Sequence, residues 1–262
     1  MEPKISEFSY GYALTEELAN WPGAELSAYP LFPSLNAEGR LGYDLRLIYG
    51  SVPLFLQFKL SHLMVRSYVK EVLDCGMQEP LFRFYLHATR HSRQHPTLLD
   101  LEVGAGNLVY YAAPAFHEGH ELNEFYLRKK VFWNSCFVPP SSIGRLPDDE
   151  RHSVGFKSPW DNKICVCSES FVREGAFSAE ALLVNLEGKL ENEAGLISNE
   201  DKLRHFEKTI FEILLKNNPI QEILAEQATV AERPLRPDLP TIAFLLKTVV
   251  GCELFFVKRS PR

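Results

Sequence analysis

The stretch GYDLRLIYGSVPLFLQFK, residues 42–59, decides which fold this 262-residue chain is expected to adopt. Residues 43–48 alternate polar with apolar side chains, whereas residues 53–60 are almost continuously apolar until Gln57 and Lys59. Both patterns predict β-strands, and residues 49–51 supply a tight turn between them. Asp44 lies on the first strand and Gln57 on the second. The two side chains can therefore meet at one edge of a sheet.

The residue types at this edge favour phosphodiester chemistry. Gln57 and Lys59 share one face because side chains alternate along a strand. A lysine on a buried strand lowers the stability of the fold unless a carboxylate or phosphate compensates its charge. The Asp44 carboxylate, the Gln57 amide oxygen and the Phe58 carbonyl are oxygen ligands of the kind that Mg²⁺ prefers. Lys59 could orient or help deprotonate the attacking water and balance the developing charge. The alternative is structural: Asp44 caps a strand, Gln57 is an edge amide and Lys59 extends to solvent.

The order of the elements around this motif resembles the PD-(D/E)XK nuclease superfamily, the restriction-endonuclease-like fold, in the variant with Gln-x-Lys instead of Glu-x-Lys. The resemblance covers about residues 5–116 and implies an α/β fold: a central mixed β-sheet flanked by helices, with the core order αβββαβ. Besides the two strands above, the sequence supplies a helix over 7–20 with Ser6 as N-cap, a helical stripe over 61–74, a strand over 81–88, a helix over 96–103 and a buried strand over 107–114.

The resemblance also implies a site and an activity. Asp44, Gln57, Lys59 and Glu17 are the expected catalytic residues, with Mg²⁺ or Mn²⁺ held by Asp44, Gln57, the carbonyl of Phe58, and Glu17, the match to a glutamate on the family's first helix; Glu16 is the second choice for that glutamate. The implied protein is a metal-dependent endonuclease that hydrolyses DNA in prokaryotic defence or restriction. Gln57 departs from the usual carboxylate and lowers the negative charge of the site. Two alternatives therefore stay open: a catalytically weak or inactive nuclease-fold subunit that binds nucleic acid or a partner protein, and an RNA-directed nuclease.

The rest of the sequence predicts strands and helices that are added to this core. Residues 1–170 would form the nuclease-like core with insertions, including the aromatic and basic segment at 123–140 and strands at 153–156 and 163–168. Residues 171–262 would form a helical extension packed on the core, with amphipathic helices at 178–190 and 199–216 and a final strand at 253–258. A single domain over 1–262 is the alternative. A homodimer or a companion defence-system subunit is a possible partner.

Composition is compatible with an intracellular enzyme. The chain is 45% hydrophobic, enough for a full core, has no apolar stretch of membrane-spanning length, and opens without the pattern of a secretory signal. These features predict a cytoplasmic protein without a membrane segment. Its five cysteines form an odd, scattered set, which favours reduced thiols, and Cys165 and Cys167 are expected to be buried small hydrophobic residues.

Charge is the main argument against a nucleic-acid partner. The net charge of −6 lacks the basic excess that drives binding to polyphosphates. Acidic residues concentrate between 174 and 232, however, which leaves the first half of the chain near neutral. A local cationic surface is available from Arg66, Lys70, Arg83, Arg90, Arg93 and the run at 128–130. These residues could equally be ordinary solvated charges.

Histidines offer a competing catalytic site. His87, His91 and His95 recur every four residues, and His117 and His120 follow in FHEGHE. The first three fall at a strand end and in a polar loop broken by Pro96, so that no helix presents them together, and HEGHE lacks the spacing of the H-E-x-x-H metalloprotease motif. A histidine that contacts phosphate near Lys59 is the more modest expectation.

Overall fold

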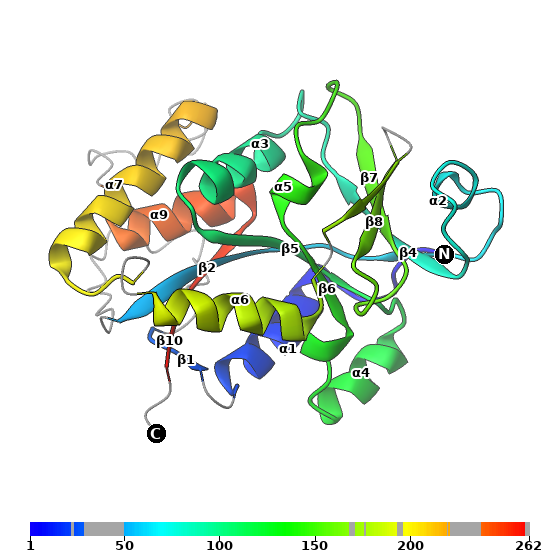
Figure 1. Ribbon diagram of the computed structural model, residues 1–262, viewed down its shortest axis with the longest axis horizontal. Helices are drawn as coiled ribbons and strands as arrows, with labels where there is room; N and C mark the ends of the chain where they lie inside the picture. Colours follow the sequence, from blue (N-terminus) through cyan, green and yellow to red (C-terminus); the bar gives the residue numbers. More distant parts are fainter. Residues whose placement is uncertain are drawn as a thin grey trace.

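The computed structural model describes residues 1–21, 24–28, 50–167, 171–175, 177–192, 196–218, 220 and 237–259. In these residues the chain forms two five-stranded β-sheets with helices packed against them (Figure 1). Asp44 and the strand expected over 43–48 lie outside the described residues.

Sheet A is the mixed sheet. Its strand order is β1 (Ala24–Leu26), β10 (Glu253–Arg259), β2 (Ser51–Phe58), β5 (Leu108–Pro114) and β6 (Ser135–Val138). β2 runs parallel to β5, and the other neighbouring pairs are antiparallel. Every residue of β2 and β5 is buried, as expected for central strands that are covered on both faces.

Helices and the second sheet cover the two faces of sheet A. On one face, Leu54 and Leu56 of β2 pack in a core with α1 (Glu7–Ala19) and α6 (Ala179–Glu191). On the other face, Phe55 packs in a second core with sheet B and the helices α3 (Gln94–Leu99), α7 (Glu200–Asn217) and α9 (Leu239–Leu245). The period of two along β2 therefore sorts its side chains between two cores.

Sheet B is antiparallel throughout. Its order is β3 (His62–Met64), β4 (Leu81–Leu86), β7 (His152–Phe156), β8 (Lys163–Val166) and β9 (Phe171–Glu174). The chain passes directly from β2 in sheet A to β3 in sheet B across residues 59–61. Phe84 of β4 meets Tyr111 of β5 with ring centroids 5.7 Å apart, so the two sheets pack against each other next to this crossing.

Shorter elements complete the described structure. They are α2 (Lys70–Leu73), the π-helical turn η1 (Asp100–Gly104), α4 (Gly119–Leu127), the 3₁₀ turn η2 (Phe132–Asn134), α5 (Pro140–Ile143) and the π-helical turn η4 (Leu246–Val250).

The predicted mixed α/β class is confirmed, and so are most individual elements. Ser6 caps α1 as predicted, because its hydroxyl accepts the backbone N–H of Ser9 at 3.0 Å. The helix predicted over 61–74 is wrong: this segment begins as β3, and only Lys70–Leu73 is helical. The strand predicted as the third core strand forms as β4 but belongs to sheet B. The described strands therefore confirm a mixed α/β fold but not the specific restriction-endonuclease-like core.

The end of the chain takes part in the same sheet as its beginning. β10 lies between β1 and β2 and pairs antiparallel with both. The helices of the last third also contribute side chains to both cores of sheet A. The described helices of the last third thus pack against sheet A, and β10 is one of its strands.

The prediction that all five thiols are reduced is wrong for one pair. Cys75, which follows α2, and Cys165 of β8 form a disulfide across a sequence separation of 90 residues. The sequence could not show this pairing, because it depends on α2 folding back over β8. Burial of Cys165 and Cys167 is confirmed, and Cys136 and Cys252 are also buried.

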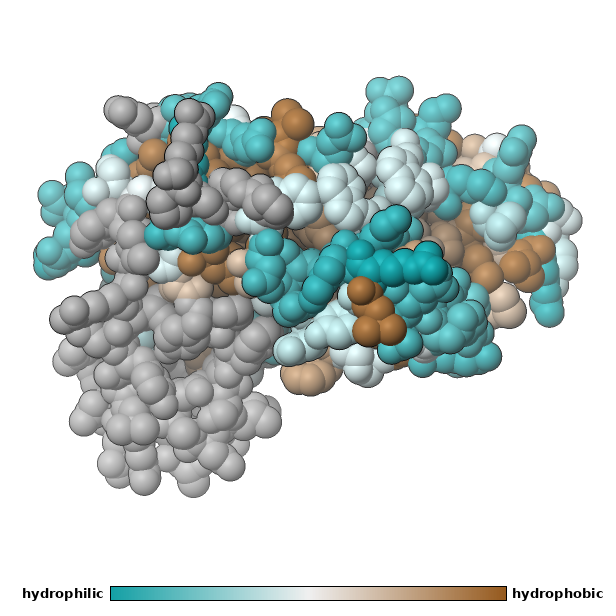
Figure 2. Space-filling view, turned by 90° about the horizontal axis from the view of Figure 1, so that it is seen from below, coloured by the Kyte–Doolittle hydropathy of each residue, from teal (hydrophilic) through white to brown (hydrophobic). Residues whose placement is uncertain are grey.

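Seen from below, the described residues form no broad apolar area. Figure 2 shows mainly hydrophilic and weakly polar side chains on this face, with strongly apolar ones in separate spots outside the grey atoms. Within the described residues, no helix combines the length and apolar character needed to cross a membrane.

Candidate functional site

Gln57 and Lys59 lie where β2 ends and the chain leaves sheet A. Both are buried, with exposed fractions of 2% and 6%. The backbone N–H of Lys59 donates to the Ala112 carbonyl of the parallel strand β5 at 2.9 Å, which continues the pairing one residue past β2. This is the carboxyl end of two parallel strands, the usual position of binding sites in open α/β sheets.

Gln94, at the start of α3, joins these two residues into one hydrogen-bonded chain. Lys59 Nζ donates to Gln94 Oε1 at 2.7 Å, and Gln94 Nε2 donates to Gln57 Oε1 at 3.1 Å and to the Val250 carbonyl at 2.5 Å. Gln57 Nε2 in turn donates to the Phe58 carbonyl at 3.0 Å. The shared face of Gln57 and Lys59 is thereby confirmed. The two oxygens predicted to hold a metal, on Gln57 and Phe58, each already accept a hydrogen bond.

Gly251 allows this chain of amides to approach the C-terminal segment closely. Its φ of +69° lies in the left-handed region, and a Cβ at this position would lie 3.4 Å from both Gln57 Oε1 and Gln94 Nε2. Glycine accepts this backbone conformation without the steric cost that other residues incur. It therefore lets η4 turn into β10 directly against the amides.

The Lys59 amine is electrostatically unusual. Burial disfavours its charged form and lowers its pKa from 10.5 to about 8, while the nearby Glu7 carboxylate acts in the opposite direction. The amine also lies 5.8 Å from the centroid of the buried Tyr111 ring. A pKa this close to neutrality is the property expected of a lysine that exchanges a proton.

Two carboxylates from opposite ends of the chain lie near the end of β2, and one of them, Glu7, acts on the Lys59 amine. Glu7 comes from the first turn of α1, and the buried Glu253 comes from the start of β10, where it forms an ion pair with Lys247. Desolvation raises the pKa of both carboxyl groups, and the amines of Lys59 and Lys247 partly reverse this for Glu7. Glu7 thus interacts with both amines, whereas Glu253 is paired with Lys247.

Glu17 is not part of this cluster. Its carboxylate accepts the backbone N–H groups of Val131 at 2.8 Å and Phe132 at 2.9 Å, so that it caps the start of η2. Ten residues of α-helix place it about 15 Å along the axis from Glu7. The acid of α1 that acts on Lys59 is Glu7, and the assignment of Glu17 to the metal site is corrected accordingly. Glu16, the second choice, forms an ion pair with Lys129 at 2.7 Å.

The sequence contained one signal for Glu7. Glu7 directly follows the N-cap Ser6, so it is the first residue of α1. Sequence periodicity assigns residues to a face of a helix but does not say which end of the helix approaches the sheet edge. No sequence motif includes Gln94, Lys247 or Glu253, so the sequence did not indicate them as site residues.

The described residues do not by themselves fit a divalent metal. Across residues 1–21, 50–167 and the other described ranges, no group of three or more His, Cys, Asp or Glu side chains is placed to hold an ion. The oxygens of Gln57 and Phe58 are engaged as described above, and Asp44 lies outside the described residues. A metal site at this position would therefore need ligands from outside the described residues, and Asp44 is the one that the sequence predicts.

His87 and His95, two of the three histidines that recur every four residues, differ in their surroundings. His95 is buried and stacked on Tyr111, and its ring nitrogens hydrogen-bond with the Tyr111 hydroxyl at 2.8 Å and the Gly144 carbonyl at 2.7 Å. These contacts give it a structural role. His87 is exposed at the end of β4, and its pKa is lowered first by desolvation and then by the charge of Lys59.

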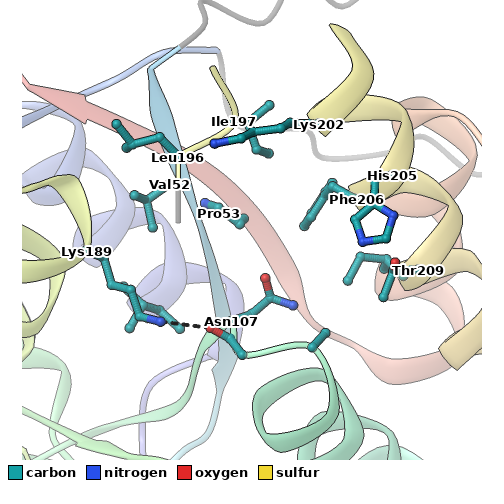
Figure 3. Close-up of a pocket in the computed structure, with 14 residues that line it drawn as sticks. Val52, Pro53, Asn107, Lys189, Leu196, Ile197, Lys202, His205, Phe206 and Thr209 are labelled. Atoms are coloured by element: carbon teal, nitrogen blue, oxygen red, sulfur yellow. Dashed lines mark hydrogen bonds between the residues drawn. The ribbon is translucent and has the colours of Figure 1, made fainter. Parts of the chain in front are cut away.

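A cleft of ≈ 320 Å³ lies at the opposite end of β2 (Figure 3). It is lined by apolar side chains of β2 and α7 and by polar ones that include Asn107, Lys189, Lys202, His205 and Thr209. The Lys189 amine donates to the Gly106 carbonyl at 3.0 Å across its floor. Because β2 spans eight residues, this cleft is separated from Lys59 by about 25 Å of extended chain.

Comparison of the chain with protein-family models, with curated proteins and with solved structures finds no match.

Proposed function

We propose that the chain is a metal-dependent nuclease that hydrolyses DNA phosphodiester bonds, with Lys59 as the amine that acts on the phosphate. The observation that supports this most directly is the burial of Lys59 at the carboxyl ends of β2 and β5, with a pKa lowered to about 8 and Glu7 beside it. A buried amine costs stability and is retained where it has an anion to bind.

Each residue of the cluster has a role in this proposal. In its protonated form Lys59 donates to a phosphate oxygen and stabilises the negative charge of the transition state, and in its neutral form it can accept a proton from water. Gln94 orients the amine, and the Glu7 carboxylate favours its protonated form. Mg²⁺ or Mn²⁺ would polarise the phosphoryl group, and its binding is proposed to require Asp44.

The proposal is tested with purified protein, supercoiled plasmid and either metal ion. We expect nicking or linearisation that is abolished in Lys59→Met and Asp44→Asn and retained in Lys208→Met, a change at an exposed lysine of α7 outside the cluster. Cleavage that persists in Lys59→Met would refute the role of the amine. The same assay with RNA in place of the plasmid tests the RNA-directed alternative.

A second candidate is a nuclease-fold subunit that binds nucleic acid, or a partner protein, without cleaving it. The hydrogen bonds that engage Gln57 Oε1 and the Phe58 carbonyl favour this reading, because these oxygens already have partners. An intact plasmid together with retained binding would support it. Sedimentation of the purified protein would show whether it forms the homodimer that the fold resemblance suggests.

A further inference from the structure

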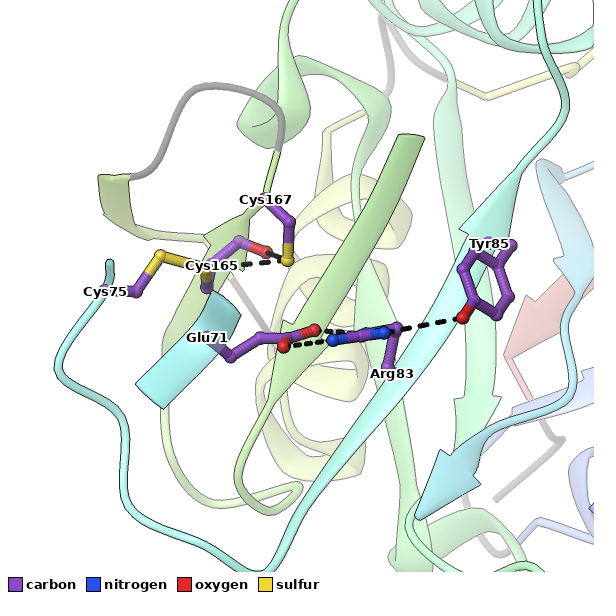
Figure 4. Close-up of polar contacts among 6 residues, drawn as sticks. All are labelled: Glu71, Cys75, Arg83, Tyr85, Cys165 and Cys167. Carbon is purple, nitrogen blue, oxygen red and sulfur yellow. Dashed lines mark hydrogen bonds and ion pairs between the residues drawn. A yellow bond between two sulfur atoms is a disulfide. The ribbon is translucent and has the colours of Figure 1, made fainter. Parts of the chain in front are cut away.

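Polar side chains away from Lys59 differ in whether their charges are compensated. Around α2, both carboxylate oxygens of Glu71 pair with the guanidinium of Arg83, which also lies 3.4 Å from the Tyr85 hydroxyl (Figure 4). This group is complete in itself. The cleft at the amino end of β2 is different, because the described residues that line it include lysines but no Asp or Glu (Figure 3).

The walls of this cleft come from elements on both faces of sheet A. Residues 196–197 are held at the start of β2, because the Ile197 backbone N–H donates to the Ser51 carbonyl at 2.9 Å and the Ile197 carbonyl accepts the Gly50 N–H at 2.8 Å. Lys189 reaches the cleft from α6, and α7 forms the opposite wall (Figure 3). The volume of ≈ 320 Å³ lies in the range of pockets that hold small molecules.

One face of α7 is turned towards the cleft. Five residues of the helix line it at the i, i+3, i+4, i+7 and i+8 spacing of a single helical stripe, namely Lys202, His205, Phe206, Thr209 and Ile210. The two apolar members of the stripe are buried, and the polar members are half-buried or exposed. The α7 wall therefore combines an apolar floor with a polar rim.

The carboxylates closest to this stripe in sequence do not line the cleft. Three of them have partners, and the pairs are Glu200 with Arg204, Glu191 with Arg259, and Glu207 with the backbone N–H of Leu239. Asp201 and Glu187 lie one and two residues before Lys202 and Lys189, so they are turned by about 100° and 200° around their helices. An anionic group in the cleft would thus meet amines without a carboxylate among the described lining residues.

Lys189 is the amine best placed to bind such a group. It is half-buried, and its Nζ donates to the Gly106 carbonyl at 3.0 Å just before β5. A carbonyl carries no net charge and accepts only one of the three N–H groups of an ammonium. The amine is therefore held in position with donors left for a ligand, and Lys202 adds a second amine on the opposite wall.

We propose that this cleft binds a small amphipathic anion, a carboxylate with an aliphatic body. The carboxylate would bind the Lys189 amine through a charge-assisted hydrogen bond, and the aliphatic part would lie against Val52, Ile197 and Phe206. About 25 Å of extended chain separates the cleft from Lys59, so the proposal does not rest on the nuclease activity.

Three ligands with the same octyl-length chain and different head groups test the charge: octanoate, octanol and octyltrimethylammonium. Isothermal titration calorimetry gives the Kd of each. We expect octanoate to bind most tightly and the cation most weakly. In Lys189→Met the Kd of octanoate should rise by about tenfold, as for the loss of one charge-assisted hydrogen bond, while the Kd of octanol stays unchanged.

Two further variants locate the binding. Lys208→Met changes an exposed lysine of α7 that does not line the cleft, and it should bind octanoate as the wild type does. Thr209→Trp places a large side chain in the cleft from a half-buried position and should abolish binding of octanoate and octanol.

Wild-type protein that binds none of the three ligands would overturn the proposal, and so would octyltrimethylammonium that binds as tightly as octanoate. An unchanged Kd for octanoate in Lys189→Met, or an equal loss of octanol binding in that variant, would refute the role of the amine. Unchanged binding in Thr209→Trp would place the ligand outside the cleft. Plasmid cleavage is a separate measurement, so failure of the nuclease and failure of the cleft are distinguishable.

Discussion

Replacing Lys59 with methionine should make the protein more stable at neutral pH and remove part of its pH dependence. Burial lowers the pKa of the amine from 10.5 to about 8, so the folded state binds fewer protons than the unfolded state between these values. The stability of the wild type must therefore rise with pH through this window. Methionine fills a similar volume and carries no charge to desolvate.

The magnitude follows from the shift. Linkage gives a gain of about 2 kcal/mol for the wild type between pH 8 and pH 10, and a cost of roughly 3 kcal/mol at pH 7 relative to a neutral side chain. The variant also loses the hydrogen bond from Lys59 to Gln94, which leaves a buried acceptor and costs about 1–2 kcal/mol. We therefore expect Lys59→Met to be more stable by about 1–2 kcal/mol at pH 7, and this advantage to vanish or reverse by about pH 10.

Urea denaturation of both proteins at a series of pH values measures this difference directly, because other titrating groups contribute equally to the two curves. The control Lys130→Met changes an exposed amine and should give a profile parallel to the wild type. Parallel profiles for wild type and Lys59→Met would refute the reasoning, since the amine would then titrate alike in the folded and unfolded states.

Three further changes test the surrounding structure. Glu7→Gln removes the carboxylate that favours the charged amine, so the pKa of Lys59 should fall further and any pH profile of cleavage should move to lower pH. Glu17→Ala should destabilise the protein by about 1–3 kcal/mol in urea denaturation, through the loss of two backbone hydrogen bonds, without changing cleavage by the folded fraction; lost cleavage at full stability would restore it to the site. Cys75→Ser should lower stability by about 2–4 kcal/mol under oxidising conditions and abolish the response of stability to dithiothreitol, and a variant that still responds would show that the bond to Cys165 does not stabilise the fold.

The elements of the fold were largely predictable because their signals are local. Ser6 marks the start of α1, alternation marks β4, and the stripe of apolar residues marks α7. The assembly of strands into sheets was not predictable in the same way. β4 alternates equally well in either sheet, and only the change of direction at residues 59–61 places it in sheet B.

The site was predictable only in part, for a related reason. Period two was enough to put Gln57 and Lys59 on one face, and the structure confirms it. In the sequence, Gln94 is one of several polar residues in a segment predicted to be a loop. Nothing in this segment indicates the turn that brings Gln94 Oε1 within 2.7 Å of Lys59 Nζ. Choosing Glu7 over Glu17 would have required knowing which end of α1 approaches the sheet edge. Side chains that converge from distant segments have no characteristic spacing in the sequence by which they could be recognised.

The site depends on the last strand of the chain as much as on the strand that carries Lys59. The Val250 carbonyl fixes Gln94, Glu253 of β10 brings a buried carboxylate and its Lys247 partner to the cluster, and Gly251 leaves room for the amides between them. β10 also covers the edge of β2 opposite β5, so that β2 becomes an inner strand. A chain that lacked residues 171–262 would expose that edge and would lose the Glu253–Lys247 ion pair beside Glu7. The helices between β9 and β10 therefore support the site indirectly. They connect sheet B to the position beside β2 in sheet A where β10 lies next to the buried amine's strand.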